Sequence, residues 1–264
     1  MKLPYTVVDA FADRPFTGNP AAVMRLDAWL DDALLQAIAA EHNLSETAFL
    51  VRDASGVADW ELRWFTPAVE VALCGHATLA SGHVLLSKDS GDRVTFGTRQ
   101  SGILSVSRHG DEYRLALPAW SMEPRDLPEL RAGLGGTPVA SFWRDGGYAL
   151  FRYTDAAAIH ALRPDFSSLR ALDRGDVLYI ATAPGEDTDI ISRVFAPGAG
   201  IDEDPVTGSA HSLLTPYWCA ELGVTHFTAH QASARGGYLT CELVGDRAVL
   251  GARCVTVSEG TMFL

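Results

Sequence analysis

An internal repeat constrains the fold of this chain more than any other sequence feature. The segment Arg63-Trp-Phe65-Thr-Pro67 recurs 130 positions later, without a gap, as Arg193-Val-Phe195-Ala-Pro197. Each copy runs from a strand-like segment through proline into a polar turn of small residues, and then into an apolar, helix-like run. The repeat therefore predicts two similar halves, each with its own core.

The repeat also pairs polar residues of the two halves. In the gapless register Cys74 coincides with Asp204, and Glu46 coincides with Asp176. If the two turns face each other, they form one cleft that is lined by Cys74, His76, Asp204, Ser209 and two helix N-termini.

Composition and charge exclude several classes of partner. The chain has 264 residues, a net charge of −12 and 21 basic residues that occur singly. This distribution offers no basic surface for nucleic acid or anionic lipid, so neither partner is predicted. No apolar stretch is long enough to cross a membrane, and the start of the chain does not resemble an export signal. Four cysteines without CxxC spacing indicate a reducing, cytoplasmic location and no structural zinc.

Hydrophobic periodicity predicts a sheet-rich α+β chain. Helices are predicted at 28–42 after a cap at Asp27, at 76–87, at 156–172 with a break at Pro164, and at 209–222. Strands are predicted at 3–11, 21–24, 47–51, 57–65, 93–97, 102–107, 112–117, 139–153, 177–183, 189–195, 224–230, 237–243 and 247–250.

The helix at 76–87 has almost no polar face, so it must be buried on all sides. A mostly antiparallel sheet that curves around a central helix satisfies this requirement. The Pro- and Gly-rich stretch 118–138 is the predicted connector, and the tail, in two segments at 253–257 and 261–264, is expected to complete the first sheet. We therefore predict one domain of residues 1–118 plus 251–264 and a second of residues 119–250.

Glu46 is the strongest candidate for a general base. It follows the first helix and stands where the chain enters a predicted strand. Partial desolvation there would raise the pKa of its carboxyl toward the range useful for proton transfer. The alternative is an ordinary solvated glutamate.

Cys74-Gly75-His76 precedes the apolar helix. Gly75 lets the backbone approach a ligand, the helix N-terminus offers free N–H groups to a carboxylate, and His76 can donate to the same anion. A buried structural cysteine and a Cys–His nucleophilic pair are the two alternatives.

The segment from Asp202 to His211 repeats this design. Asp204, Gly208 and Ser209 again place an acid and small residues before a helix. Capping and helix-dipole complementarity would explain one acid, whereas the repetition favours a ligand site with two sides. Metal binding is not predicted here, because no pair of histidines at i and i+4 accompanies the acids.

Two loop residues are further candidates for substrate binding. Arg235 lies in a glycine-rich turn, where it is either part of a hairpin loop or a ligand for an acidic substrate. Asn19, in Gly18-Asn19-Pro20, belongs either to an exposed loop or to the site.

Together these motifs resemble the PhzF-like (phenazine biosynthesis-like) family of isomerases, within the wider fold of diaminopimelate epimerase and proline racemase. The matching pieces keep the family's order and spacing across nearly the whole chain. They are Val8–Phe11, Phe16–Val23, Asn43–Phe49, Arg63–Pro67, Glu70, Cys74–Thr78 and Asp204–Ala210.

The resemblance implies two pseudo-symmetric domains, each a sheet rolled around a helix, and a reaction without a cofactor. It implies that Glu46 moves a proton on a small carboxylate-bearing substrate, which His76, Asp204 and Ser209 orient while the backbone at Gly75 and Gly208 holds its carboxylate. An edge strand in each rolled sheet can support a homodimer.

One departure bears on the substrate. The turn at 231–237 differs from the Gly-Arg-Pro-Gly form of phenazine-pathway members, so the phenazine substrate does not follow from the resemblance. Two alternatives stay open: a binding module that retains the cleft without catalysis, and an enzyme that depends on Cys74.

Overall fold

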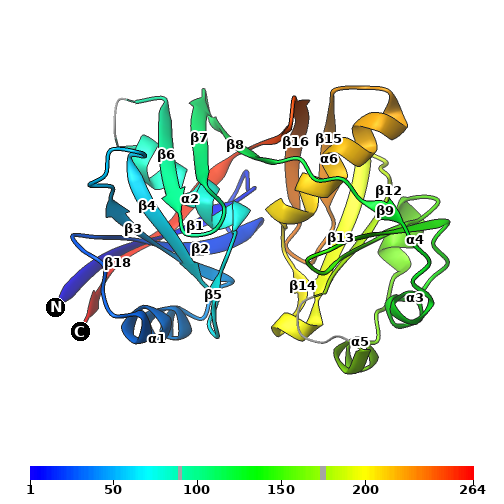
Figure 1. The fold of residues 1–264 in the computed structure, drawn as a ribbon, viewed down its shortest axis with the longest axis horizontal. Helices are drawn as coiled ribbons and strands as arrows, with labels where there is room; N and C mark the ends of the chain where they lie inside the picture. The colour runs from blue at the N-terminus through cyan, green and yellow to red at the C-terminus, as the bar shows by residue number, and fades with distance from the viewer. Residues whose placement is uncertain (89–90, 173–176) are drawn as a thin grey trace. The chain divides into compact units, whose positions relative to one another are not determined.

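The structure, a computed structural model, describes residues 1–88, 91–172 and 177–264. The chain divides into two compact units, residues 1–117 with 249–264 and residues 118–248. Figure 1 shows both units as sheet-rich α+β structures, as the sequence predicts. Each unit is described by itself below.

Unit 1 is a sheet that curves around one helix (Figure 1). Most neighbouring strands pair antiparallel, whereas β2 with β3 and β4 with β6 pair parallel. Its strands are β1 Lys2–Ala10, β2 Asn19–Leu26, β3 Glu46–Arg52, β4 Trp60–Phe65, β5 Glu70–Val71, β6 Arg93–Thr98, β7 Ile103–His109, β8 Glu112–Pro118 and β18 Cys254–Phe263. β17, Arg247–Ala252, spans the boundary between the two units.

The central helix of unit 1 is α2, Gly75–Leu86, and it is buried almost all round. His83 is its one residue that is not fully buried. Gly82 lets the helix approach the sheet closely, because a Cβ atom there would lie 2.4 Å from Val106 Cγ1 on β7. The prediction of a buried apolar helix inside a curved sheet is confirmed.

The C-terminal tail completes the sheet of unit 1, as predicted, but it does so as one strand. β18 pairs antiparallel with β1 from Cys254 opposite Ala10 to Phe263 opposite Lys2. The predicted break after residue 257 is wrong. Gly260 continues the ladder opposite Tyr5, where the aromatic ring occupies the space of a side chain.

The amphipathic helix of unit 1 starts later than predicted. α1 runs over Asp32–His42, and Asp31 rather than Asp27 is its cap, since the Asp31 carboxylate accepts from the Ala33 N–H. Asn43 ends the helix in the left-handed conformation, as its position suggests. Leu35 and Ile38 pack into the core with Phe49 of β3.

Unit 2 repeats the plan with its own sheet and central helix. Its strands are β9 Glu123–Pro124, β10 Ala140–Arg144, β11 Tyr148–Arg152, β12 Leu178–Pro184, β13 Ile190–Ala196, β14 Ile201–Asp204, β15 His226–Gln231 and β16 Gly237–Val244. Its helical segments are α3 Pro128–Leu134, α4 Ala156–Ala161, α5 Phe166–Leu172, the 3-10 turn η1 Pro197–Ala199 and α6 Gly208–Leu222.

Two predictions in unit 2 need correction. The strand predicted at 139–153 is the hairpin of β10 and β11, because Gly146 and Gly147 turn the chain with positive φ values. The predicted connector at 118–138 contains β9 and the helix α3. The helix predicted from Ser209 to Leu222 is α6, which begins one residue earlier and ends at Gly223.

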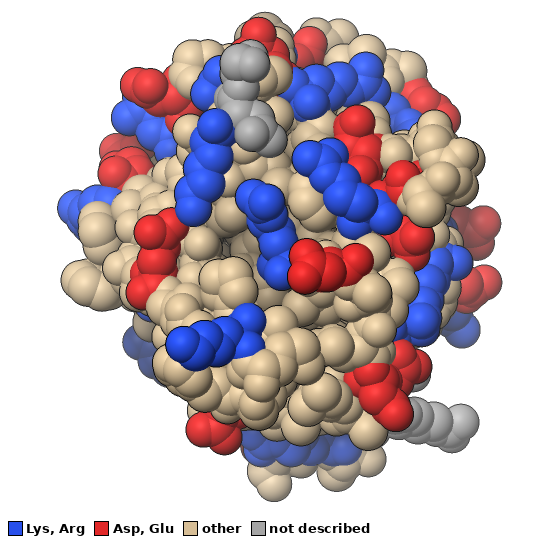
Figure 2. All heavy atoms as spheres, turned by 90° about the vertical axis from the view of Figure 1, so that its left-hand side faces the viewer, with Lys and Arg blue, Asp and Glu red and all other residues tan. Residues whose placement is uncertain are grey.

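The surface in Figure 2 carries Lys and Arg side chains interspersed with Asp and Glu. Within the described ranges, no helix has both the length and the apolar character that crossing a membrane requires.

Candidate functional site

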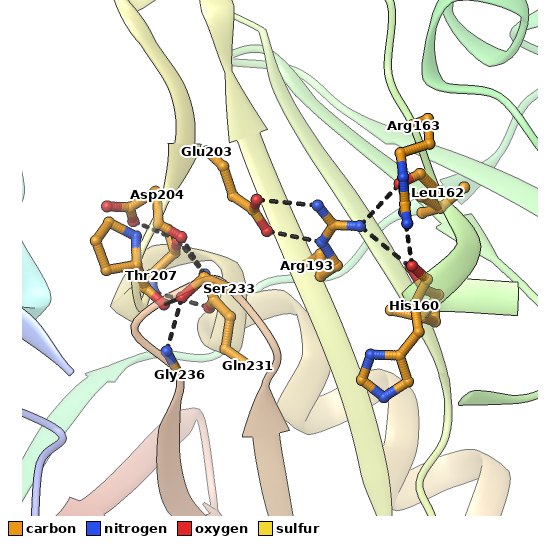
Figure 3. Close-up of polar contacts among 12 residues, drawn as sticks. His160, Leu162, Arg163, Arg193, Glu203, Asp204, Thr207, Gln231, Ser233 and Gly236 are labelled. Atoms are coloured by element: carbon orange, nitrogen blue, oxygen red, sulfur yellow. Dashed lines mark hydrogen bonds and ion pairs between the residues drawn. The ribbon is translucent and has the colours of Figure 1, made fainter. Parts of the chain in front are cut away.

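The two halves share an arginine that clamps the turn before each central helix, and it is buried in unit 1 and half-buried in unit 2. In unit 1, Arg63 of β4 makes two hydrogen bonds of 2.7 Å to the Glu70 carboxylate of β5. In unit 2, Arg193 of β13 binds the Glu203 carboxylate of β14 at 2.7 and 2.9 Å (Figure 3). Each pair fixes the strand that leads into the helix, and each uses the planar two-pronged geometry of arginine.

The starts of the two central helices revise the register of the repeat. Phe65 lies ten positions before the start of α2 at Gly75, whereas Phe195 lies thirteen positions before the start of α6 at Gly208. The second turn is therefore three residues longer, and it contains η1. The structural counterpart of Cys74 is Thr207, the N-cap of α6, rather than Asp204.

Strand pairing also revises the counterpart of Glu46. Thr47 of β3 pairs with Phe65, and in unit 2 Tyr179 of β12 pairs with Phe195. The position before Tyr179 is Leu178, so unit 2 has no carboxylate where Glu46 stands in this register. Asp176, which the gapless repeat pairs with Glu46, lies outside the described residues.

Unit 1 brings Glu46 and His76 into direct contact. Glu46 is the first residue of β3, as its predicted strand entry requires, and His76 is in the first turn of α2. Glu46 Oε2 lies 3.0 Å from His76 Nε2, with the carboxylate side chain 14% exposed and the imidazole 5%. Within the described residues, Glu46 Oε1 has no hydrogen-bond partner, so this oxygen is available to a substrate.

Asn19 holds the other side of the His76 ring. The buried Asn19 Nδ2 lies 3.1 Å from His76 Nδ1. The contact depends on the turn at Gly18, which has a φ of +65°. Only glycine fits there, because a β-carbon would lie 2.1 Å from the carbonyl oxygen of Ala10. Asn19 is therefore buried against His76, and the alternative of an exposed loop residue is wrong.

The contacts of His76 allow two arrangements of protons, a neutral imidazole and an imidazolium. If Asn19 Nδ2 donates to His76 Nδ1, the imidazole proton is on Nε2 and points at the Glu46 carboxylate. This tautomer stabilises ionised Glu46, the form that accepts a proton. Burial lowers the pKa of His76, but its contacts with Cys74 and Glu46 raise it well above its ordinary value and favour the imidazolium. Both ring nitrogens are donors in that form, so the Asn19 amide then presents its oxygen to Nδ1.

Cys74 adjoins the same imidazole but remains a thiol. Its Sγ lies 3.5 Å from His76 Nδ1 and 3.9 Å from Nε2. Burial, followed by the Glu46 charge, raises the pKa of Cys74 to about 11. The thiolate that a cysteine nucleophile needs is therefore disfavoured, and the interpretation as a buried cysteine gains support.

The N-terminus of α2 offers main-chain donors beside these side chains. Cys74 is the N-cap and its side chain does not cap the helix. Among the described residues, the N–H groups of Gly75 and His76 have no acceptor, as is usual in a first turn. Such N–H groups can receive a carboxylate.

In unit 2, Gln231 organises the turn that carries Asp204. The Gln231 amide accepts from the Thr207 N–H at 2.9 Å and donates to the Asp204 carbonyl at 2.8 Å (Figure 3). The Thr207 hydroxyl donates in turn to the Asp204 carboxylate. Asp204 is thus a partly buried acid in a fixed position at the end of β14.

The start of α6 holds the other candidates of unit 2. Gly208 and Ser209 form its first turn, and the Ser209 side chain lies near that of Tyr148. Burial raises the pKa of Tyr148, and Ser209 and Arg144 partly oppose this rise. Arg235 is half-buried in the loop between β15 and β16.

Sequence reasoning assigned no role to three residues near these candidates: Glu70, Gln231 and Tyr148. The repeated pairing of an arginine with a later glutamate carried a signal for Glu70. Gln231 and Tyr148 act through contacts with residues far away in the chain, so no local pattern marks them.

The profile of the family described as "Phenazine biosynthesis-like protein" matches residues 8–126 and 139–260. An uncharacterized isomerase of Pseudomonas aeruginosa is 48% identical, with 100% of both chains covered. The crystal structure of a PhzF family protein of Enterococcus faecalis superposes with a TM-score of 0.92 at 43% identity, covering 100% of both chains.

A more distant structure shows the fold alone. A hydroxyproline epimerase of Agrobacterium vitis has a TM-score of 0.65 at 12% identity, with 98% of this chain and 92% of the epimerase covered.

Proposed function

The chain belongs to the phenazine biosynthesis-like family, and from that premise we propose that it is an isomerase which shifts a proton within a small carboxylate-bearing metabolite. The contact between Glu46 Oε2 and His76 Nε2 at 3.0 Å carries the proposal. It leaves the other Glu46 oxygen without a hydrogen-bond partner among the described residues, and it joins the carboxylate to a residue in the first turn of α2.

In the proposed reaction Glu46 acts as both base and acid. Its Oε1 takes a proton from an activated carbon of the substrate as the C–H bond breaks, and the electron pair moves into the conjugated carboxylate system. The N–H groups of Gly75 and His76 stabilise the negative charge that develops there. Glu46 then returns the proton to another carbon of the same molecule, so no external oxidant or reductant is needed.

His76 and Asn19 position the base. The Nε2–H of His76 holds Glu46 Oε2, and Asn19 fixes the orientation of the ring. Because the imidazole proton holds the carboxylate in place, His76→Asn should lower kcat.

We further propose that Asp204 and Ser209 contribute to substrate orientation from unit 2, together with Gly208 and Arg235. The repeated cradle of small residues before α6 supports this part of the proposal. Asp204→Asn should lower kcat/KM, whereas Asp202→Asn, at an exposed acid two residues earlier, should not.

Glu46→Gln tests the proposal directly. A panel of small carboxylic acids with an acidic C–H group is first screened for thermal stabilisation, since a ligand at 100 times its Kd adds about 2.7 kcal/mol. The acids that bind are then assayed for isomerisation by NMR. The glutamine variant should keep its fold and its ligand binding and lose about 10²- to 10⁴-fold in turnover; full turnover would refute the role of Glu46.

A binding module without catalysis is the alternative. It predicts that ligands stabilise the protein but that neither wild type nor variant converts any of them.

A further inference from the structure

Glu46, Cys74 and His76 also form a set of ligands for a transition metal. We propose that these three side chains bind one zinc ion, and that zinc thereby inhibits the isomerase reversibly. The inhibition rests on the proposed function, whereas the binding of zinc does not. Sequence patterns alone predict no metal site, because the three residues show no recognised spacing.

The distances fit a zinc site. His76 Nε2 lies 3.0 Å from Glu46 Oε2 and 3.9 Å from Cys74 Sγ, and the ligand atoms of all three residues lie within 4.8 Å of one another. Zinc bonds of about 2.0–2.3 Å in a tetrahedral arrangement separate ligand atoms by about 3.3–3.7 Å. The Glu46–His76 pair is within a few tenths of an ångström of this separation. Cys74 Sγ lies closer to His76 Nδ1, at 3.5 Å, than to Nε2, so the cysteine side chain must rotate toward an ion that Nε2 and Oε2 hold.

The chemistry of the three donors favours zinc over calcium or magnesium. A thiolate, an imidazole nitrogen and a carboxylate oxygen are its usual ligands, whereas the hard cations prefer oxygen alone. Among the described residues this is the one group of three such side chains that are close enough to share an ion. Three protein ligands leave a fourth position open for water or for a substrate carboxylate.

The surroundings of the three residues also suit an ion. Cys74 and His76 are buried at the start of α2, and Glu46 is held at the start of β3, so rigid elements position every ligand. Asn19 contacts the second nitrogen of His76, as residues behind a metal-bound histidine commonly do. Because that nitrogen would carry the proton in the zinc-bound state, the Asn19 amide must rotate to accept with its oxygen.

Charge balance permits the ion in this buried place. One Zn²⁺ with a Glu46 carboxylate and a Cys74 thiolate is neutral overall. Binding therefore displaces the thiol proton to solvent, and a second proton leaves if His76 starts as imidazolium. It also occupies Glu46, so the base can no longer accept a proton from substrate.

Zinc binding is measured first, without substrate. Chelator-treated protein is titrated with Zn²⁺ against a chromophoric chelator, and cobalt is used as a spectroscopic probe. We expect one equivalent of zinc and a thiolate-to-cobalt charge-transfer band. Cys74→Ser and Glu46→Gln should each weaken zinc binding by about 10- to 100-fold, by analogy with the effect of other changes around metal sites.

Cys254→Ala is the matched control. It removes another cysteine of unit 1, outside the three-residue set, and should leave zinc affinity unchanged. Circular dichroism of every variant separates a lost ligand from a lost fold. The site is refuted if folded Cys74→Ser and Glu46→Gln bind zinc as tightly as wild type, or if wild type binds none.

Inhibition is then measured on a converted substrate. Zinc at the concentration that fills the site should abolish turnover, and a chelator should restore it. Turnover that persists at full occupancy refutes the inhibitory role. If zinc does not bind but Glu46→Gln still abolishes turnover, the zinc inference fails and the proposed function stands. If zinc binds but the protein converts none of the acids, the proposed function fails and the zinc site stands.

Discussion

Arg63→Met tests the clamp before the central helix of unit 1. The Arg63 side chain is 3% exposed and binds Glu70 through two bonds of 2.7 Å and Asp32 at 2.9 Å. Its guanidinium also lies 5.1 Å from the Trp29 ring centroid and 5.0 Å from that of Phe65. Methionine keeps part of the apolar stem but leaves both acids without this cation.

The expected loss of unfolding free energy is about 2–4 kcal/mol. Breaking a fully buried ion pair costs about 3–5 kcal/mol because a charge remains buried and unpaired. Glu70 is 28% exposed and Asp32 is 66% exposed, so water partly compensates these acids. The loss from the ion pairs therefore falls at or below the lower end of that range, and the lost cation–π contacts add to it, which gives about 2–4 kcal/mol in total.

Arg99→Met is the matched control, because Arg99 binds the same two acids from the surface. Its side chain is 54% exposed, with contacts of 3.2 Å to Glu70 and 3.9 Å to Asp32. We expect a loss below about 1 kcal/mol. Urea unfolding followed by circular dichroism measures both variants, since urea does not screen charges; equal losses would refute the clamp.

The remaining predictions concern pH, thiol reactivity and backbone strain. Burial lowers the pKa of His211 to about 4, so below a pH of about 6.5 the unfolded state binds a proton that the folded state does not. The free energy of unfolding should therefore drop by about 2–3 kcal/mol between pH 7 and 4.5. Urea unfolding should show that His211→Gln lacks this contribution to the pH dependence of stability. The pKa of Cys74 is raised from 9.0 to about 11, so iodoacetamide should alkylate this thiol about 100-fold more slowly in the folded than in the unfolded protein. Peptide mass spectrometry measures both rates. Rapid alkylation that also inactivates the protein would support a Cys74-dependent enzyme. Gly18→Ala should lower the free energy of unfolding by more than about 2 kcal/mol, as measured by thermal unfolding. Gly56→Ala should lower it by about 1 kcal/mol, because Gly56 has a similar φ but no atom near the added carbon. A smaller loss at Gly18 than at Gly56 would contradict the tight turn before Asn19.

Residues with strong local signals could be placed from the sequence. The helix at 76–87 has no polar face, and only the interior of a curved sheet accommodates it. Glu46 follows a helix stop and starts a strand, and Gly75 and His76 precede an apolar run, so their places at the start of β3 and α2 were predictable.

The remaining features depend on contacts that no local pattern records. The gapless repeat paired Cys74 with Asp204, because sequence similarity ends at Pro197, before the three additional residues that η1 accommodates. Gln231 is an ordinary strand residue until the fold brings it to Thr207, 24 positions away. Helix α1 starts at Asp32 because Asp31 caps it, although Asp27 is an equally good cap by composition.

The most direct test of the central claim is deuterium exchange into a bound carboxylic acid. An acid that stabilises the protein is incubated in D₂O with wild type and with Glu46→Gln, and label at its activated carbon is followed by NMR. If Glu46 takes up the substrate proton, wild type should introduce deuterium at least about 100-fold faster than the glutamine variant. Equal rates in both proteins would contradict the account.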